Sequence, residues 1–344
     1  MLYFRNDYVE GCHPAILEKL AETNMEQLPG YGEDKYCESA KEKIKRACGT
    51  PDADVHFVVG GTQANCICVC AALRPHQGVI SADSGHINGH EVGAVEATGH
   101  KILALPSRDG TICAEQVEAC LKGHFTDRIA EHLVQPAMVY VSHPTETGTL
   151  YTKQQLTDIK RVCTQYNVPL FLDGARLGYG LTSPYNDLTL ADIAALCDIF
   201  YIGGTKCGAL FGEAIVITND ALKKDFRYII KQRGALLAKG RLLGIQFDVL
   251  FSGNLYFDIC ETAVEYALRI RKAFEEKGVS MWGDATANQQ FPILTDAQIA
   301  YLGKKYDFDF TARYDETHAI VRFCTSWATQ EAAVNRLIED IWAM

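Results

Sequence analysis

The stretch DIFYIGGTKCGALFGEAIVIT, residues 198–218, contains two apolar runs joined by a glycine-rich loop that carries a single lysine. The runs DIFYI (198–202) and EAIVIT (213–218) are rich in β-branched and aromatic residues, which is typical of buried strands. Five earlier runs have the same character: DVHFVV (54–59), GVISA (78–82), KILAL (101–105), AMVYVS (137–142) and PLFLD (169–173). The sequence therefore predicts seven strands.

The segments between these strands have the spacing of amphipathic helices. Residues 152–167, for example, place Leu156, Ile159, Val162 and Cys163 on one helical face. Nearly continuous apolar strands that alternate with helices are typical of a parallel sheet that is covered on both faces. We therefore expect an α/β fold with a mainly parallel seven-stranded sheet covered by helices.

The pattern changes near residue 235. A long helical stretch is expected from Ala235 through Lys277, and a closing helix from Thr329 to Trp342. Between them lies a strand-rich segment that includes QQFPIL (289–294) and HAIVRFCTS (318–326). We therefore predict a large α/β domain over residues 1–245, with the N-terminal segment, and a small α+β domain over residues 246–344.

Composition excludes several classes of partner. The 344 residues are 48% hydrophobic and 22% charged, enough to bury a large core, and the formal net charge is −10. Proteins that bind nucleic acid or anionic membranes usually carry a concentrated patch of positive charge, and this chain has no run of Lys or Arg. Both are therefore poor partners for it. The first residues, MLYFRNDYVEG, are charged, and no apolar run approaches the ~20 residues of a membrane span. We expect a cytoplasmic protein whose 13 cysteines are mostly reduced, buried thiols.

Two chemistry-bearing groups follow predicted strands, where ligands of α/β sheets collect. GGTQAN (60–65) follows the first strand. Gly61 and Thr62 could hold an anion with their backbone N–H groups, although a plain turn with Thr62 as the helix N-cap has the same sequence. Asp173 ends another strand, and a local ion pair with Arg176 is as compatible with this pattern as a functional role.

Lys206 follows the next strand in the glycine-rich loop. Apolar surroundings disfavour the ammonium form, which lowers the pKa of a lysine and suits it to Schiff-base chemistry. A surface lysine with a partly buried stem is the alternative. An anion cradle, an acid and a secluded amine are together the groups that hold pyridoxal 5'-phosphate: a phosphate clamp, a partner for the ring nitrogen and an amine for the aldehyde.

The sequence resembles the threonine aldolase branch of the β-eliminating lyase family, pyridoxal-phosphate enzymes of fold type I, over nearly its whole length. The matching pieces, in order, are FRNDYV (4–9), YGEDKY (31–36), VGGTQAN (59–65), ADSGHINGHEVGA (82–94), TETGTLY (145–151), LDGARL (172–177), GGTK (203–206), KGRLLG (239–244) and AIVRFCTS (319–326). Their order and spacing make the resemblance much more specific than any one motif.

The resemblance implies a role for each cofactor-binding residue. Lys206 looks like the Schiff-base lysine, Asp173 like the acid on the pyridine nitrogen, and Gly61 and Thr62 like the phosphate binders. His86 resembles the histidine that stacks on the cofactor ring; a structural loop histidine is the alternative.

The resemblance also implies residues for the substrate and for a partner subunit. Arg176 and Arg322 look like the clamp on the substrate carboxylate, and Asn6 stands where the family commonly has a serine that helps this clamp. Tyr31, as a substrate-binding group, and Arg241, as a cofactor-binding group, resemble residues that reach a neighbouring subunit's site. A homodimer or homotetramer with shared active sites is therefore expected.

Two departures from the family pattern leave the base at the substrate hydroxyl open. Many members have a histidine in the loop that here reads SHPTETGT, in which His143 is out of register. The segment after His86 is also different, with His90 and Glu91 in NGHEVG.

The activity implied by the resemblance is retro-aldol cleavage of L-threonine or L-allo-threonine to glycine and acetaldehyde. Another pyridoxal-phosphate-dependent lyase, or a racemase, acting on a small amino acid is the alternative. A metallohydrolase using His86, His90 and Glu91 is a weaker hypothesis, and so is a binding protein that has kept only the fold.

Overall fold

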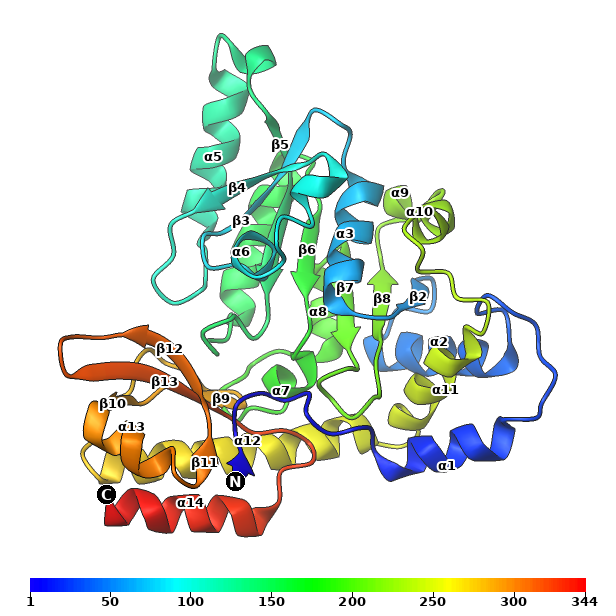
Figure 1. Ribbon diagram of the computed structural model, residues 1–344. Coiled ribbons are helices and arrows are strands. Elements are labelled where there is room, and N and C mark those ends of the chain that lie inside the picture. The colour runs from blue at the N-terminus through cyan, green and yellow to red at the C-terminus, as the bar shows by residue number, and fades with distance from the viewer.

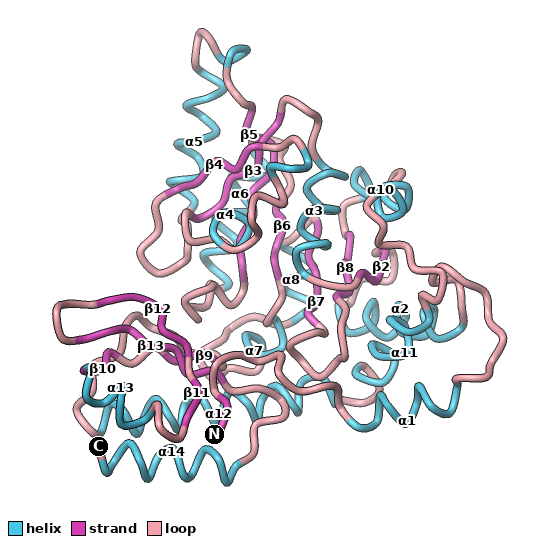
Figure 2. The backbone as a smooth tube through the Cα atoms, in the orientation of Figure 1, coloured by secondary structure: helices cyan, strands magenta, loops and turns pink.

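The computed structural model describes residues 1–344. It has two parts, a large sheet covered by helices and a smaller sheet that packs on helices of its own (Figure 1). Figure 2 shows the strands of both sheets in magenta, and both chain ends lie beside the smaller sheet. None of the helices is both long and apolar enough to cross a membrane.

The seven predicted strands all form, and they belong to one sheet with the order β2-β8-β7-β6-β5-β3-β4. β8 is antiparallel to both of its neighbours, and the other neighbouring pairs are parallel. The predicted α/β class with a mainly parallel seven-stranded sheet is therefore confirmed. The bounds are β2 (Asp54–Val58), β3 (Gln77–Ala82), β4 (Lys101–Leu105), β5 (Gln135–Ser142), β6 (Leu170–Asp173), β7 (Ile199–Gly203) and β8 (Glu213–Ile217).

Both faces of this sheet are buried because alternate residues of each strand point to opposite sides. On β3, Ile80 belongs to the larger core and Val79 to the smaller one. The larger core packs under α2 (Lys35–Cys48), α5 (Ala114–Thr126), α6 (Lys153–Gln165), α8 (Leu190–Leu196) and α11 (Arg241–Leu250). The smaller core packs under α3 (Gly61–Ala72) and α10 (Phe226–Gln232).

Local sequence signals set the ends of several helices. The side chains of Thr152 and Gln155 form a capping box at the start of α6, and Asp34 caps α2. α2 ends at Gly49, whose φ of 65° lies in the left-handed region that favours glycine. The remaining helices of the large part are α1 (Pro14–Thr23), α4 (His86–Gly89), α7 (Leu177–Leu181), α9 (Asp220–Lys223) and the 3₁₀ turns η1 (Glu96–Thr98) and η2 (Ala130–His132).

The smaller part is built around an antiparallel sheet of order β10-β13-β12, with β9 also paired to β13. The strands are β9 (Gln289–Gln290), β10 (Ile293–Thr295), β12 (Asp309–Arg313) and β13 (His318–Cys324), and the helices are α12 (Leu255–Glu276), α13 (Asp296–Leu302) and α14 (Glu331–Ala343). β12 was not predicted because most of its residues are exposed, so that its sequence lacks an apolar face.

The single long helix expected between Ala235 and Lys277 is wrong. The chain instead forms α11 and α12, separated by residues 251–254. Gly253 has a φ of 70°, which an α-helix does not accommodate. The helical spacing of apolar residues continues on both sides of this turn, and for that reason it was not seen in the sequence.

The first residues of the chain belong spatially with the smaller part. β1 (Leu2–Tyr3) pairs in parallel with β11 (Tyr306–Asp307), and the chain then runs toward the large sheet. The domain division at residue 245 stays a prediction. The N-terminal strand β1, which this division assigns to the large domain, contacts the smaller part through β11.

Candidate active site

The carboxyl ends of β5, β6 and β7 bring the predicted groups to one edge of the large sheet. Ser142, the last residue of β5, is paired in register with Asp173, the last residue of β6. Lys206 follows β7, which ends at Gly203. Because parallel strands end on the same side, residues that are far apart in sequence meet here.

Asp173 is 4% exposed and accepts hydrogen bonds on both carboxylate oxygens. Oδ1 accepts from the backbone N–H of Ala175 (3.0 Å) and from the Tyr201 hydroxyl. Oδ2 accepts from the Tyr140 hydroxyl (2.6 Å) and from Asn65 Nδ2 (3.1 Å). All of these donors are neutral. The local Asp173–Arg176 ion pair left open by the sequence is not formed, because Arg176 pairs elsewhere.

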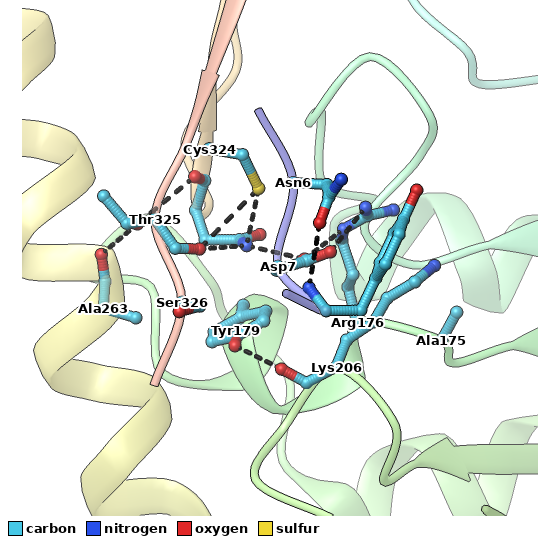
Figure 3. Close-up of polar contacts among 12 residues, drawn as sticks. Asn6, Asp7, Ala175, Arg176, Tyr179, Lys206, Ala263, Cys324, Thr325 and Ser326 are labelled. Carbon is cyan, nitrogen blue, oxygen red and sulfur yellow. Dashed lines mark hydrogen bonds and ion pairs between the residues drawn. The ribbon is translucent and has the colours of Figure 1, made fainter. Parts of the chain in front are cut away.

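Lys206 is half-buried, and its Nζ makes no hydrogen bond or ion pair. Burial, and then the nearby charge of Arg176, lower the pKa of Lys206, while the carboxylates of Asp7 and Asp173 act in the opposite direction. The backbone carbonyl of Lys206 accepts a 2.5 Å hydrogen bond from the Tyr179 hydroxyl (Figure 3). The peptide is thus held in place while the amine is left free.

His86 lies at the start of α4 and is connected to Asp173 through two buried side chains. Its Nδ1 is 2.7 Å from Glu91 Oε1, which also accepts from Asn65 Nδ2 at 2.7 Å. Burial opposes a charge on His86, but the hydrogen bond to Glu91 and the charge of Asp173 outweigh it, so the pKa of His86 is raised. His86 is therefore biased toward its protonated form.

His90 does not join His86 in a metal site. The two ring centroids are 5.7 Å apart, Glu91 binds His86, and no group of three or more His, Cys, Asp or Glu side chains is arranged to hold a metal ion. Burial lowers the pKa of His90, with further contributions from His86 and Arg322. The arrangement of these donors gives no support to the metallohydrolase hypothesis.

Gly61 and Thr62 form the first turn of α3, whose N-cap, Gly60, has no side-chain cap. The backbone N–H groups at the start of this 12-residue helix find no acceptor in the protein. A Cβ atom on Gly61 would lie 3.0 Å from the Tyr201 hydroxyl, so a side chain there would crowd the site. Free N–H groups at a helix N-terminus form a ready cradle for a phosphate.

The N-terminal segment brings two residues, Asn6 and Asp7, to Arg176 and Lys206. Asp7 is fully buried and binds Arg176 through two contacts, Oδ2 to Nε (2.7 Å) and Oδ1 to Nη2 (2.9 Å) (Figure 3). Asn288 Nδ2 donates to the same Oδ2 at 2.9 Å. Asn6 lies beside them, half-buried, with its Oδ1 accepting from the backbone N–H of Tyr8. The expected open fork of Arg176 is therefore occupied by Asp7, and only Nη1 is left for a ligand.

Arg322 lies on β13 and contacts the N-terminal segment at Arg5. Its Nη2 donates to the backbone carbonyl of Arg5 (3.1 Å) and pairs with Asp309 (3.1 Å). Its Nε is buried and has no hydrogen-bond partner. Asn6, Arg176 and Arg322 are thus brought together around residues 5–7, with unused donors on both arginines.

Tyr31 and Arg241 are not part of this group. Arg241 donates to the backbone carbonyls of Glu26 and Asn24, and Tyr31 lies under the ammonium of Lys231 at 4.7 Å. Tyr31 is 44% exposed and has a φ of 61°. Neither side chain contacts Lys206, Asp173 or His86, so their predicted reach into a partner subunit's site stays a prediction.

The sequence alone did not reveal several buried polar residues of the site. Asp7, Asn65, Tyr140 and Tyr201 have no distinctive spacing that would have singled them out. Glu213 begins β8 directly after the Lys206 loop and is 3% exposed. It accepts from the backbone N–H of Gly204 (3.0 Å), and burial raises its pKa to about 8. A charged residue at the start of an otherwise apolar strand was the one available signal.

Four features define a fold-type-I pyridoxal-phosphate enzyme. They are the mainly parallel sheet, the uncapped helix N-terminus after β2, the acid after β6 and the free lysine after β7. The donors and acceptors present fit this cofactor. The family described as Beta-eliminating lyase matches residues 4–300, and the chain belongs to that family. It is a pyridoxal-phosphate-dependent lyase.

Threonine aldolases are among the relatives. The chain is 28% identical to low specificity L-threonine aldolases of a Pseudomonas species (99% of this chain, 97% of that protein) and of Pseudomonas aeruginosa (98% and 96%). It resembles the solved structure of Leishmania major threonine aldolase with a TM-score of 0.96 and 48% identity, covering 99% of this chain and 98% of that one. A Thermus thermophilus aspartate aminotransferase, with a TM-score of 0.71 and 14% identity over 100% and 91% of the two chains, shows the shared fold alone.

Proposed function

We propose that the protein cleaves L-threonine or L-allo-threonine to glycine and acetaldehyde. The observation that carries the proposal is the unpaired amine of Lys206, which lies near the charges of Asp173 and Arg176. The names of the relatives that cover nearly the whole chain support the same substrate class.

Each residue of the site has a task in this reaction. Pyridoxal phosphate, when bound, supplies an aldehyde for an amine and a ring that takes up the electron pair of a broken bond to Cα. Lys206 Nζ, with its lowered pKa, would bind the aldehyde carbon. The N–H groups of Gly61 and Thr62 would hold the phosphate, and Asp173 would hold a proton on the ring nitrogen.

The substrate is oriented by the other half of the site. Arg176 Nη1 and Arg322 Nε are free donors that would hold the carboxylate, with the Asn6 amide beside them. A carboxylate held by two arginines fixes rotation about the Cα–N bond, and this decides which bond to Cα stands perpendicular to the ring. Positioning of the Cα–Cβ bond is what separates aldol cleavage from racemisation.

The test is product analysis. The purified protein, supplied with pyridoxal phosphate, is incubated with L-threonine and separately with L-allo-threonine, and acetaldehyde and glycine are quantified. Equal amounts of the two products support the proposal. Racemised substrate or a keto acid with ammonia, in the absence of acetaldehyde, would instead favour another pyridoxal-phosphate-dependent reaction on a small amino acid.

Tyr31 is exposed and Arg241 is half-buried, and both lie away from Lys206. We propose a homodimer or homotetramer in which they complete the partner's site. Mixing two inactive variants, Lys206→Ala and Arg241→Ala, tests this arrangement. Activity regained on mixing supports shared sites, and absence of complementation contradicts them.

A further inference from the structure

Glu146 is a half-buried residue at the edge of the site whose carboxyl group has no task in the reaction described above. It lies on the loop after β5, where its Oε1 accepts the backbone N–H of His86 at 2.9 Å and lies 2.7 Å from Ser142 Oγ. Its other oxygen, Oε2, is buried and has no hydrogen-bond partner. An unpartnered carboxylate oxygen is costly to bury, which makes a purely structural role poorly suited to this side chain.

A chain of hydroxyl groups connects Glu146 to Asp173. Ser142 Oγ lies 3.2 Å from the Tyr140 hydroxyl, which donates to Asp173 Oδ2 at 2.6 Å. Ser142 Oγ donates to Glu146 Oε1, so this oxygen is held by Ser142 and by the backbone N–H of His86. Oε2 has no partner and is therefore the oxygen that is available to take up a proton.

The charges around Glu146 favour such a proton. Burial, with a further contribution from the charge of Asp173, raises the pKa of Glu146, while the Ser142 hydrogen bond and His86 act in the opposite direction. The remaining titratable groups that face it are the phenols of Tyr140 and Tyr151. A carboxylate whose pKa is raised accepts a proton more readily than a surface glutamate.

The other candidate bases nearby are less suitable. His143 is fully buried, its Nδ1 accepts from the backbone N–H of Tyr151, and its Nε2 packs against Gly180 of α7. His86 Nδ1 is engaged by Glu91 Oε1 at 2.7 Å, and the pKa of His86 is raised by that hydrogen bond and by the charge of Asp173. His90, with its lowered pKa, is the one remaining rival.

We propose that Glu146 is the catalytic base that removes the proton from the β-hydroxyl of the substrate. The proposal rests on the proposed function. The hydroxyl proton moves to the Glu146 carboxylate, the O–H electron pair forms the carbonyl of the aldehyde, and the Cα–Cβ bond breaks. The electron pair of that bond stays with Cα, which takes up a proton from solvent to give glycine, and Glu146 returns its own proton to solvent.

The experiment compares two reactions of the same holoenzyme. Cleavage of L-threonine needs the hydroxyl-side base, whereas exchange of the α-hydrogen of glycine with D₂O, followed by NMR, needs the cofactor and Lys206 but has no hydroxyl. The variant is Glu146→Gln, which keeps an oxygen for His86 and Ser142. Glu131→Gln, at an exposed position in η2, is the matched control, and His90→Gln tests the rival.

We expect E146Q to lower kcat for threonine cleavage by at least about 100-fold. KM and the rate of glycine exchange should stay within about 3-fold of wild type by the same reasoning, since the carboxylate clamp and Lys206 are unchanged. The cofactor Kd, measured by fluorescence titration of the unloaded protein, and its melting temperature should also be unchanged.

Three results would overturn the role. E146Q could cleave threonine at nearly the wild-type rate, it could lose glycine exchange and cofactor affinity in parallel with cleavage, or H90Q could show the selective loss instead. A wild-type protein that exchanges glycine but releases no acetaldehyde from threonine would refute the proposed function itself, and with it the substrate on which Glu146 acts.

Discussion

Replacement of Asp7 by alanine should destabilise the protein strongly, because Asp7 neutralises the buried Arg176. The Asp7 side chain is 0% exposed and that of Arg176 is 13% exposed, and three donor contacts converge on the carboxylate from Arg176 and Asn288. Removal of one partner of a buried ion pair typically costs about 3–5 kcal/mol, since the other charge is left without compensation. We expect a loss of this size for D7A.

The N-terminal segment offers a matched control two residues away. Arg5 pairs with Asp307 at 2.8 Å, but the side chains are 55% and 22% exposed. An exposed pair of this kind contributes about 0–1 kcal/mol, so D307A should lose at most that amount. Urea unfolding of the unloaded proteins, followed by circular dichroism, measures both variants under one protocol. Equal losses for D7A and D307A would refute the assignment of Asp7 as the counter-ion of Arg176.

A double variant separates the ion pair from simple packing. When both partners are replaced by apolar residues, as in D7L combined with R176M, no unpaired charge remains buried. The double variant should therefore be more stable than D7A alone. If the loss of stability in the double variant equals the sum of the losses in D7L and R176M alone, Asp7 and Arg176 do not interact energetically.

The stabilisation by Asp7 should also depend on pH in a defined direction. Burial alone would raise the pKa of Asp7, but Arg176 and Lys206 hold it below the ordinary value of 3.8. A depressed pKa means that the stabilisation is present above about pH 4. It is lost as the pH falls through the folded-state pKa. The difference between wild type and D7A should thus shrink in acid, and a difference that grows below pH 4 would contradict the sign.

The other predictions concern Lys206, Arg322 and Glu213. K206A should abolish turnover and leave no borohydride-reducible cofactor adduct by mass spectrometry; an adduct at another lysine would remove Lys206 from its proposed role. R322K should raise KM for threonine and lower kcat without changing the cofactor Kd, because an ammonium cannot reproduce the planar fork; loss of cofactor with a normal KM would contradict the carboxylate clamp. Burial raises the pKa of Glu213 to about 8, whereas in the unfolded chain it has the ordinary value of 4.5. The free energy of unfolding should therefore fall as the pH rises from about 4.5 to about 8, by at most about 1.4 kcal/mol per pH unit. E213Q should gain melting temperature over wild type as the pH rises from 6 to 8, and an unchanged difference would show that the carboxyl group does not titrate there.

The sequence by itself determined the seven strands of the large sheet, the α/β class and the edge of the sheet at which Lys206 and Asp173 lie. These features depend on local information: apolar runs of strand length, helical spacing between them, and polar residues directly after a strand. The cofactor followed from three such strand-end groups, and the substrate class from the resemblance carried by ordered motifs along the chain.

Tertiary structure alone decided how the polar residues pair. Arg176 has Asp173 three residues away, yet it binds Asp7, which is 169 residues distant, because the N-terminal segment is fixed against the smaller part by β1 and β11. The hydroxyl chain from Glu146 to Asp173 likewise joins two strands and a loop whose neighbours are set by sheet order. Periodicity in a sequence reports which face of an element is buried, but the partner of a buried charge depends on which distant segments pack against it.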